Sequence, residues 1–71
     1  MTLGEFIKWL TDNHCDLVPM PEWNRANTLQ IIHRRSGRTA SLNTNIRGDV
    51  HVAVIEGICT RLGVGFPPDY L

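Results

Sequence analysis

The sequence predicts an α+β domain in which two helices pack on one face of a three-stranded antiparallel sheet, in the order α-β-β-β-α. Two observations predict this fold. Apolar residues recur with helical spacing near each end of the chain, and short β-branched runs separated by turn-forming residues lie between them. The chain has 71 residues, of which 42% are hydrophobic and 20% charged. We therefore expect one folded domain over residues 1–64, followed by a proline-containing arm over residues 65–71.

The first helix is predicted over residues 2–13. Thr2 and Glu5 have the spacing of a capping box, in which each side chain accepts a hydrogen bond from the other residue's backbone N–H. Asn13 is a suitable residue to end the helix, because asparagine tolerates the left-handed conformation. Trp9 lies beside the apolar stripe and is expected at the rim of the core or on a contact surface. The stripe itself consists of Leu3, Phe6, Ile7 and Leu10.

Three strands are predicted next, over residues 15–20, 28–34 and 38–44. Pro19 lacks an N–H and confines the first strand to an edge of the sheet. The other two strands form a hairpin around a three-residue loop at 35–37, where Gly37 supplies the positive φ. Leu29 and Ile31 share one face of the hairpin, which we expect to lie under the helices. The opposite face, which carries Gln30 and Ile32, is expected to be partly exposed.

The last helix is predicted to follow an N-cap at Asp49 and to end at Gly63. Gly57 lies inside this helix at a cost of about 1 kcal/mol relative to alanine, which favours a close backbone contact at that position. The apolar stripe consists of Val50, Val54, Ile55, Ile58, Cys59 and Leu62.

The positive charge of the chain is concentrated in its middle. Residues 23–48 contain five arginines and no acidic residue, whereas the rest of the chain carries all seven acids with Lys8 and Arg61. The arginine fork suits phosphate because it donates two parallel hydrogen bonds. These arginines are candidate nucleic-acid-binding residues, or else the solvated rim of an ordinary sheet. They are Arg25, Arg34, Arg35, Arg38 and Arg47.

His33 is the candidate catalytic base, because three arginines that could neutralise a phosphate lie close to it in sequence. The alternative is a histidine at the end of a strand and the rim of the core. Cys15 and Cys59 are expected to be small buried thiols in a reducing cytoplasm. The spacing of cysteines and histidines is not that of a zinc site, and we expect no metal and no cofactor. A membrane span is not expected either.

The chain resembles the HicA family of small toxins, whose fold is similar to a double-stranded-RNA-binding domain. Three segments carry the resemblance: LGEFIKWLTDNHCDLV, HRRSGRTASLN and VIEGICTRLGV. The resemblance implies a cytoplasmic RNA-binding protein of a toxin–antitoxin pair, with metal-independent ribonuclease activity and an antitoxin-like partner. The family carries its catalytic histidine in a Gly-Ser-His motif, and alignment on Gly37 places Leu29 at that histidine position.

The sequence therefore favours a small RNA-binding domain, and the missing family histidine argues against cleavage. The alternative is a protein-interaction module that forms a homodimer or binds a partner protein. Trp9, the face with Gln30 and Ile32, and the arm at 65–71 are the surfaces that such a module would use.

Overall fold

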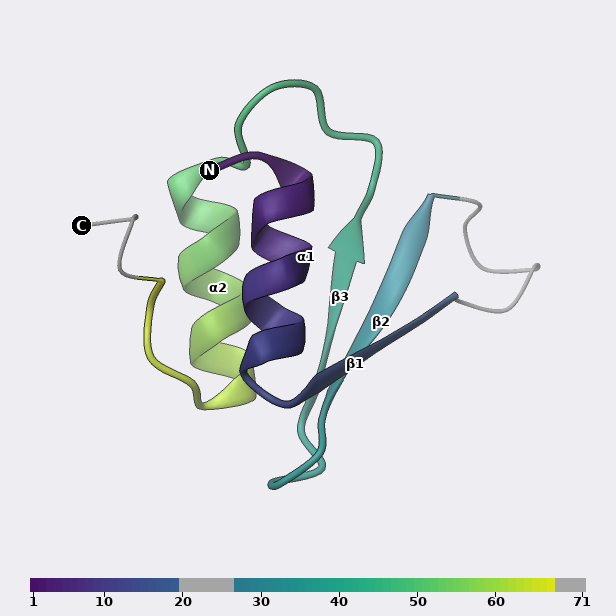
Figure 1. The fold of residues 1–71 in the computed structure, drawn as a ribbon, viewed down its shortest axis with the longest axis vertical. Coiled ribbons are helices and arrows are strands. Elements are labelled where there is room, and N and C mark those ends of the chain that lie inside the picture. Colours follow the sequence, from purple (N-terminus) through teal and green to yellow (C-terminus); the bar gives the residue numbers. More distant parts are fainter. Residues whose placement is uncertain (20–26, 68–71) are drawn as a thin grey trace.

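The computed structural model describes residues 1–19 and 27–67, and its helices and strands follow the predicted order. They are α1 (Leu3–Asp12), β1 (Cys15–Pro19), β2 (Thr28–His33), β3 (Thr39–Asn43) and α2 (Val52–Leu62). The strands form one antiparallel sheet in the order β1-β2-β3, so that β1 and β3 are its edges (Figure 1). The predicted α+β class and the order α-β-β-β-α are confirmed.

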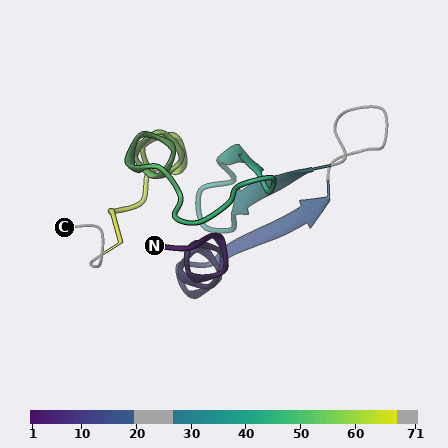
Figure 2. The ribbon, with the colours of Figure 1, turned by 90° about the horizontal axis from the view of Figure 1, so that it is seen from above.

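The molecule has two layers, because α1 and α2 lie side by side on the same face of the sheet (Figure 2). α1 packs against β1, and α2 packs against β3. The core between the layers is apolar throughout, which is what a domain of this size needs in order to be stable. Its buried side chains are Phe6, Leu10, Cys15, Ile31, Ala40, Leu42, Val50, Ile55, Ile58, Cys59 and Leu62.

The register of the sheet decides which strand residues reach the core. Ile31 lies opposite Leu17 on one neighbouring strand and opposite Ala40 on the other, and all three face the helices. Gln30 lies between Val18 and Ser41 on the opposite face, where both of these neighbours are exposed. The predicted assignment of the two faces is therefore confirmed.

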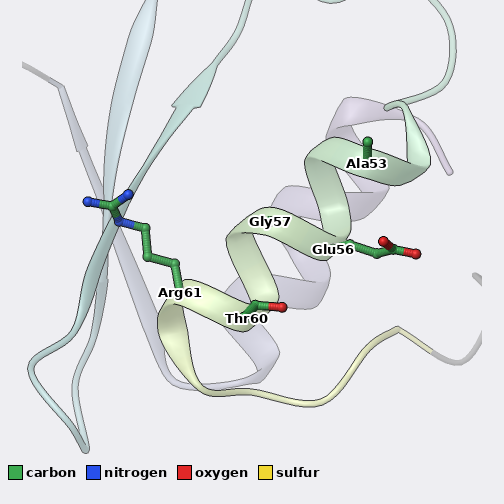
Figure 3. A pocket seen from close by; sticks show the side chains of 5 residues that line it. All are labelled: Ala53, Glu56, Gly57, Thr60 and Arg61. Atoms are coloured by element: carbon green, nitrogen blue, oxygen red, sulfur yellow. The ribbon is translucent and has the colours of Figure 1, made fainter.

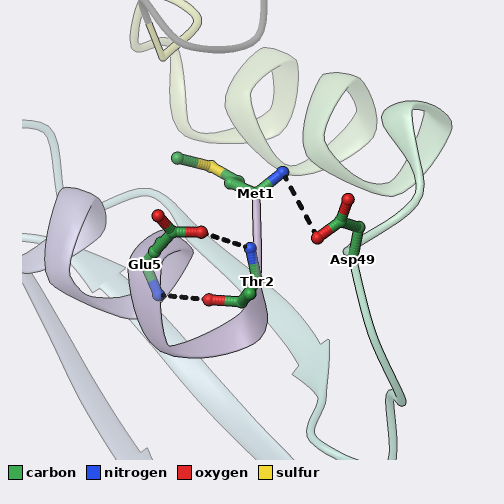
Figure 4. Close-up of polar contacts among 4 residues, drawn as sticks. All are labelled: Met1, Thr2, Glu5 and Asp49. Carbon is green, nitrogen blue, oxygen red and sulfur yellow. Dashed lines mark hydrogen bonds and ion pairs between the residues drawn. The ribbon is translucent and has the colours of Figure 1, made fainter.

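The capping box predicted for α1 is present. The Thr2 hydroxyl accepts a hydrogen bond from the Glu5 N–H at 3.2 Å, and the Thr2 N–H donates to Oε1 of Glu5 at 2.8 Å (Figure 4). The bond that the carboxylate accepts from the Thr2 backbone lowers the pKa of Glu5. At the other end of α1 the left-handed residue is His14, with φ 65°, and not Asn13. Asn13 is the C-cap, and its side-chain amide donates to the Trp9 carbonyl at 2.8 Å.

The predicted N-cap of α2 is wrong. His51 caps the helix in place of Asp49, because its Nδ1 accepts the Ala53 N–H at 3.0 Å. Asp49 is held away by the start of the chain. It forms a β-bridge with Thr2, and its Oδ1 lies 4.0 Å from the Met1 ammonium (Figure 4). This pairing with the N-terminus delays α2 until residue 52, a long-range effect that local capping rules do not include.

Two further expectations for α2 are also wrong. Val54 is 38% exposed and lies outside the buried stripe, since it is adjacent in sequence to the buried Ile55 and is turned about 100° from it. Within residues 1–19 and 27–67, Gly57 makes no close backbone contact, because a Cβ placed there would have no neighbour within 4 Å. The predicted end at Gly63 is confirmed, with φ 73° in the left-handed region.

Trp9 lies half-buried at the rim of the core, where its ring stacks on Phe6 with 6.1 Å between the ring centroids. The described part of the C-terminal arm stops at Pro67, whose ring is buried, while Phe66 beside it is 45% exposed. The remainder of the arm lies outside the described residues. Within residues 1–19 and 27–67, neither helix has the length and apolarity needed to cross a membrane.

Candidate nucleic-acid interface

The turn between β2 and β3 is one residue longer than predicted. The His33 N–H donates to the Arg38 carbonyl at 2.8 Å, so the strands remain paired up to these two residues and the loop spans residues 34–37. Gly37 closes this loop with φ 73°, and its N–H donates to the His33 carbonyl at 2.8 Å. Arg34, which was expected to end the second strand, therefore belongs to the loop.

His33 has a structural place in this turn. Its Nδ1 lies 2.8 Å from the Ser36 hydroxyl, with which it shares a hydrogen bond, and the same hydroxyl accepts the Arg38 N–H at 3.2 Å. The imidazole is half-buried at the rim of the core face, opposite Cys15 of β1. Among the described residues no acid or second base contacts it. Its catalytic role stays a prediction without geometric support.

Arg34 is partly neutralised by Asp16. Its Nε lies 3.5 Å from Oδ1 of Asp16, and both side chains are more than half exposed. An exposed ion pair of this kind contributes about 1 kcal/mol or less, so a phosphate could compete for the guanidinium.

Arg35 reaches from the hairpin to the end of α1. Its Nη2 lies 3.1 Å from Nε2 of His14, so the guanidinium donates to the imidazole. The backbone supports the same contact, since the Arg34 N–H donates to the His14 carbonyl at 3.0 Å. The turn after α1 is thereby fixed against the hairpin turn.

Arg38 crosses the C-terminal end of α2. A Cβ at Gly63 would lie 2.7 Å from Nη1 of Arg38, so the guanidinium rests in the space that a glycine leaves open. Arg61, in the last turn of α2, is also exposed. Within residues 1–19 and 27–67, neither Arg38 nor Arg61 forms an ion pair.

These contacts gather cationic groups at one end of the molecule, where both helices end beside the hairpin turn (Figure 1). We call this surface the hairpin end. The carboxylates nearest to it in the chain are those of Asp12 and Asp16, and Asp16 is paired with Arg34. The hairpin end therefore keeps an excess of arginine. It consists of His14, His33, Arg34, Arg35, Arg38 and Arg61.

Not all of the predicted arginines belong to this surface. Arg47 lies in the connection that follows β3, at the opposite end of the sheet from the hairpin turn. Asp49, whose carboxylate lies 4.0 Å from the Met1 ammonium, follows Arg47 two residues later in the chain. Arg25 lies outside the described residues. Of the five candidate arginines, the structure therefore places Arg34, Arg35 and Arg38 at the hairpin end, together with Arg61, and it places Arg47 elsewhere.

Sequence reasoning missed Arg61 and His14 as members of this surface. Arg61 lies in the last turn of α2 but off its buried stripe, a position at which a basic residue complements the helix dipole. That signal indicates an exposed cation but does not say which part of the chain it meets. Only the packing of α2 beside β3 brings Arg61 to the hairpin.

The thiols of Cys15 and Cys59 are buried and have raised pKa values. Burial raises the pKa of the Cys15 thiol, and burial together with the Cys15 charge raises the pKa of Cys59 to about 11. Both cysteines are buried and protonated at neutral pH, as the sequence predicted for small apolar groups. No three metal-ligating side chains of the described residues are grouped together.

Comparison of the chain with protein-family models, with curated proteins and with solved structures finds no match.

Proposed function

We propose that this chain is a small RNA-binding domain that holds a phosphate backbone at the hairpin end. The observation that carries the proposal is the exposure of Arg35 and Arg38 of the hairpin turn at the same end of the molecule as Arg61 of α2. A guanidinium without a carboxylate partner can bind phosphate without first breaking an ion pair.

The arrangement suits contact with a backbone better than recognition of bases. Arginines bind phosphates in any sequence, whereas base recognition needs side chains that reach base edges. The α-β-β-β-α order, which resembles the fold of the HicA toxins, favours RNA over DNA. An antitoxin-like partner and a cytoplasmic location belong to the same resemblance and are part of this proposal.

We propose binding without cleavage. RNA cleavage by transfer of the phosphoryl group to the 2′-oxygen needs two groups. One is a base that takes the proton of the 2′-hydroxyl, and the other is a donor that protonates the leaving oxygen. Nδ1 of His33 is engaged with Ser36, which leaves Nε2 as the only candidate base, and no second acid or base of the described residues contacts the imidazole. The chemistry that the resemblance implies therefore has no assembled site around His33.

The proposal is tested by the anisotropy of a labelled RNA hairpin titrated with the protein at low salt. The triple variant Arg35→Gln, Arg38→Gln, Arg61→Gln should bind at least about tenfold more weakly than the wild type. Arg47→Gln, which removes one arginine from the opposite end, is the matched control and should change the affinity little. Equal affinity for the wild type and the triple variant would contradict the proposal.

Two further experiments test whether the ligand is RNA rather than DNA and whether the bound RNA is cleaved. A DNA hairpin of the same sequence should bind more weakly than the RNA. The RNA should be recovered intact on a denaturing gel after incubation with the wild type or with His33→Ala. Cleavage by the wild type that disappears in His33→Ala would replace binding by a ribonuclease activity.

A further inference from the structure

A shallow groove runs between β3 and α2, on the side of the molecule away from α1. Its volume is about 310 Å³. A second hollow lies next to it on the same face of α2 (Figure 3). The two share Ala53, Gly57 and Arg61. The groove is lined by Ala40, Ser41, Ala53, Val54, Gly57, Ile58 and Arg61.

The strand wall of this groove is β3, which pairs with no strand beyond β2 among the described residues. The His33 N–H bonds to the Arg38 carbonyl and the Thr44 N–H bonds to the Asn27 carbonyl, which fixes the alternation of hydrogen bonds along β3. In an antiparallel ladder, every second residue of a strand directs both its backbone N–H and its C=O toward a given neighbouring strand, and the residues between direct theirs to the other side. The N–H and C=O groups of Thr39, Ser41 and Asn43 therefore point away from β2, and Ser41 also lines the groove.

The two edges of the sheet differ in their protection. On β1 the outward-facing residues are Cys15, Leu17 and Pro19, and Pro19 has no N–H to offer. On β3 no proline or lysine interrupts the edge. Natural proteins usually protect an exposed edge with such residues, so an unprotected edge beside an open groove is suited to pairing with another strand.

The helix wall has room for the side chains of an added strand. Gly57 faces the groove, and a Cβ at that position would meet no atom of the described residues within 4 Å. Ala53 adds a second small residue, one turn earlier (Figure 3). Val54, which is 38% exposed, offers an apolar contact beside them. A strand laid along β3 would turn alternate side chains toward this surface.

The positive charge at one end of the groove favours one chain direction for a peptide segment bound along β3. The Arg61 side chain extends from α2 toward the strands (Figure 3), and Arg38 immediately precedes the start of β3 at the same end. A segment antiparallel to β3 ends at this point, so its C-terminal carboxylate or a terminal acidic side chain would meet these two guanidinium groups.

We infer that the edge of β3 is a docking site for an extended peptide segment of a partner protein, which adds a fourth strand antiparallel to β3. Its backbone bonds to the N–H and C=O groups of Thr39, Ser41 and Asn43, its apolar side chains lie over Ala53 and Gly57, and its carboxylate meets Arg61. Main-chain bonds give such a complex its affinity, and the side-chain pockets give it specificity. This inference does not depend on RNA binding.

The probe is a synthetic mixture of short peptides in which threonine alternates with valine, isoleucine or leucine, each ending in a free carboxylate. Titrated into the ¹⁵N-labelled chain, the mixture should shift and protect the amide resonances of Thr39, Ser41 and Asn43. The same mixture with amidated C-termini should bind about fivefold more weakly, because the contact with Arg61 is lost.

Two variants separate this site from others. Gly57→Leu fills the groove from a position where a side chain has open space, and it should weaken binding at least about tenfold without loss of helicity. Ser41→Pro removes an outward N–H and should have the same effect. Lys8→Gln on α1 is the matched control and should bind as the wild type does.

The inference is overturned by the absence of amide shifts, by shifts that map to another surface, or by unchanged binding in Gly57→Leu. Sedimentation without peptide tests a second copy of the chain as the occupant. A dimer that Gly57→Leu abolishes would assign the groove to that second copy and reject the partner peptide.

Discussion

Gly57 and Gly63 lie six residues apart and have opposite roles. Gly57 is inside α2 with open space around it, whereas Gly63 ends the helix with φ 73° and the Arg38 guanidinium beside it. A glycine in a helix interior costs conformational entropy, and a glycine at a left-handed C-terminal position avoids strain. The same substitution should therefore change stability in opposite directions at the two positions.

Gly57→Ala should stabilise the domain by about 0.5–1 kcal/mol, because alanine adopts the same helical conformation and loses less freedom on folding. Gly63→Ala should destabilise it by about 1–2 kcal/mol, because a Cβ is strained at positive φ. Urea unfolding followed by circular dichroism measures both. A Gly63→Ala variant as stable as the wild type would show that the left-handed cap does not form.

At the scale of the element, the two helices show which capping signals can be predicted. The box of Thr2 and Glu5 was predicted correctly because both of its partners lie within one turn. The cap of α2 was not, because Asp49 pairs with the N-terminus and His51 takes its place. For the strands too, the feature set by local sequence was predicted and the feature set by pairing was not. Their alternation predicted the faces, while a single hydrogen bond from His33 to Arg38 lengthened the loop.

The cap of α1 should make stability depend on pH. The pKa of Glu5 is lowered in the folded chain by the hydrogen bonds with Thr2, so ionised Glu5 stabilises the fold above its ordinary pKa of 4.5. This contribution is lost as pH falls through the lower folded value. Glu5→Gln should therefore be less stable than the wild type at neutral pH, and the two should converge in acid. A stability difference that persists at low pH would contradict this account.

At the scale of the whole molecule, both cysteines belong to the layer between the helices and the sheet. Cys15 comes from β1 and Cys59 from α2, and both are buried. Burial keeps the thiols protonated, with the pKa of Cys59 raised to about 11. Reaction with a thiol reagent at neutral pH then requires the core to open.

Labelling of Cys59 by an aromatic disulfide reagent should therefore be slower in the native chain than in the denatured chain by several orders of magnitude. The destabilised Gly63→Ala variant should label faster, by about tenfold for each 1.4 kcal/mol of stability that it loses. Native labelling as fast as that of the denatured chain would place Cys59 at the surface.

The set of arginines at the hairpin end depends on the packing of the whole molecule as well as on the local sequence. The hairpin arginines are consecutive or nearly so, and their grouping was predicted from the sequence. Arg47 was predicted to join them, but β3 carries the chain to the opposite end of the sheet before Arg47 is reached. Arg61 was not predicted, because only the packing of α2 against β3 places it near the hairpin.

The most direct test of RNA binding by the hairpin end is the salt dependence of affinity for a labelled RNA hairpin. Each phosphate contact releases counterions and steepens the plot of log K against log salt by about 0.7–0.9. The triple variant Arg35→Gln, Arg38→Gln, Arg61→Gln should therefore have a slope shallower by about 2–3. Arg47→Gln should keep the wild-type slope. Identical slopes for the wild type and the triple variant would contradict RNA binding at the hairpin end.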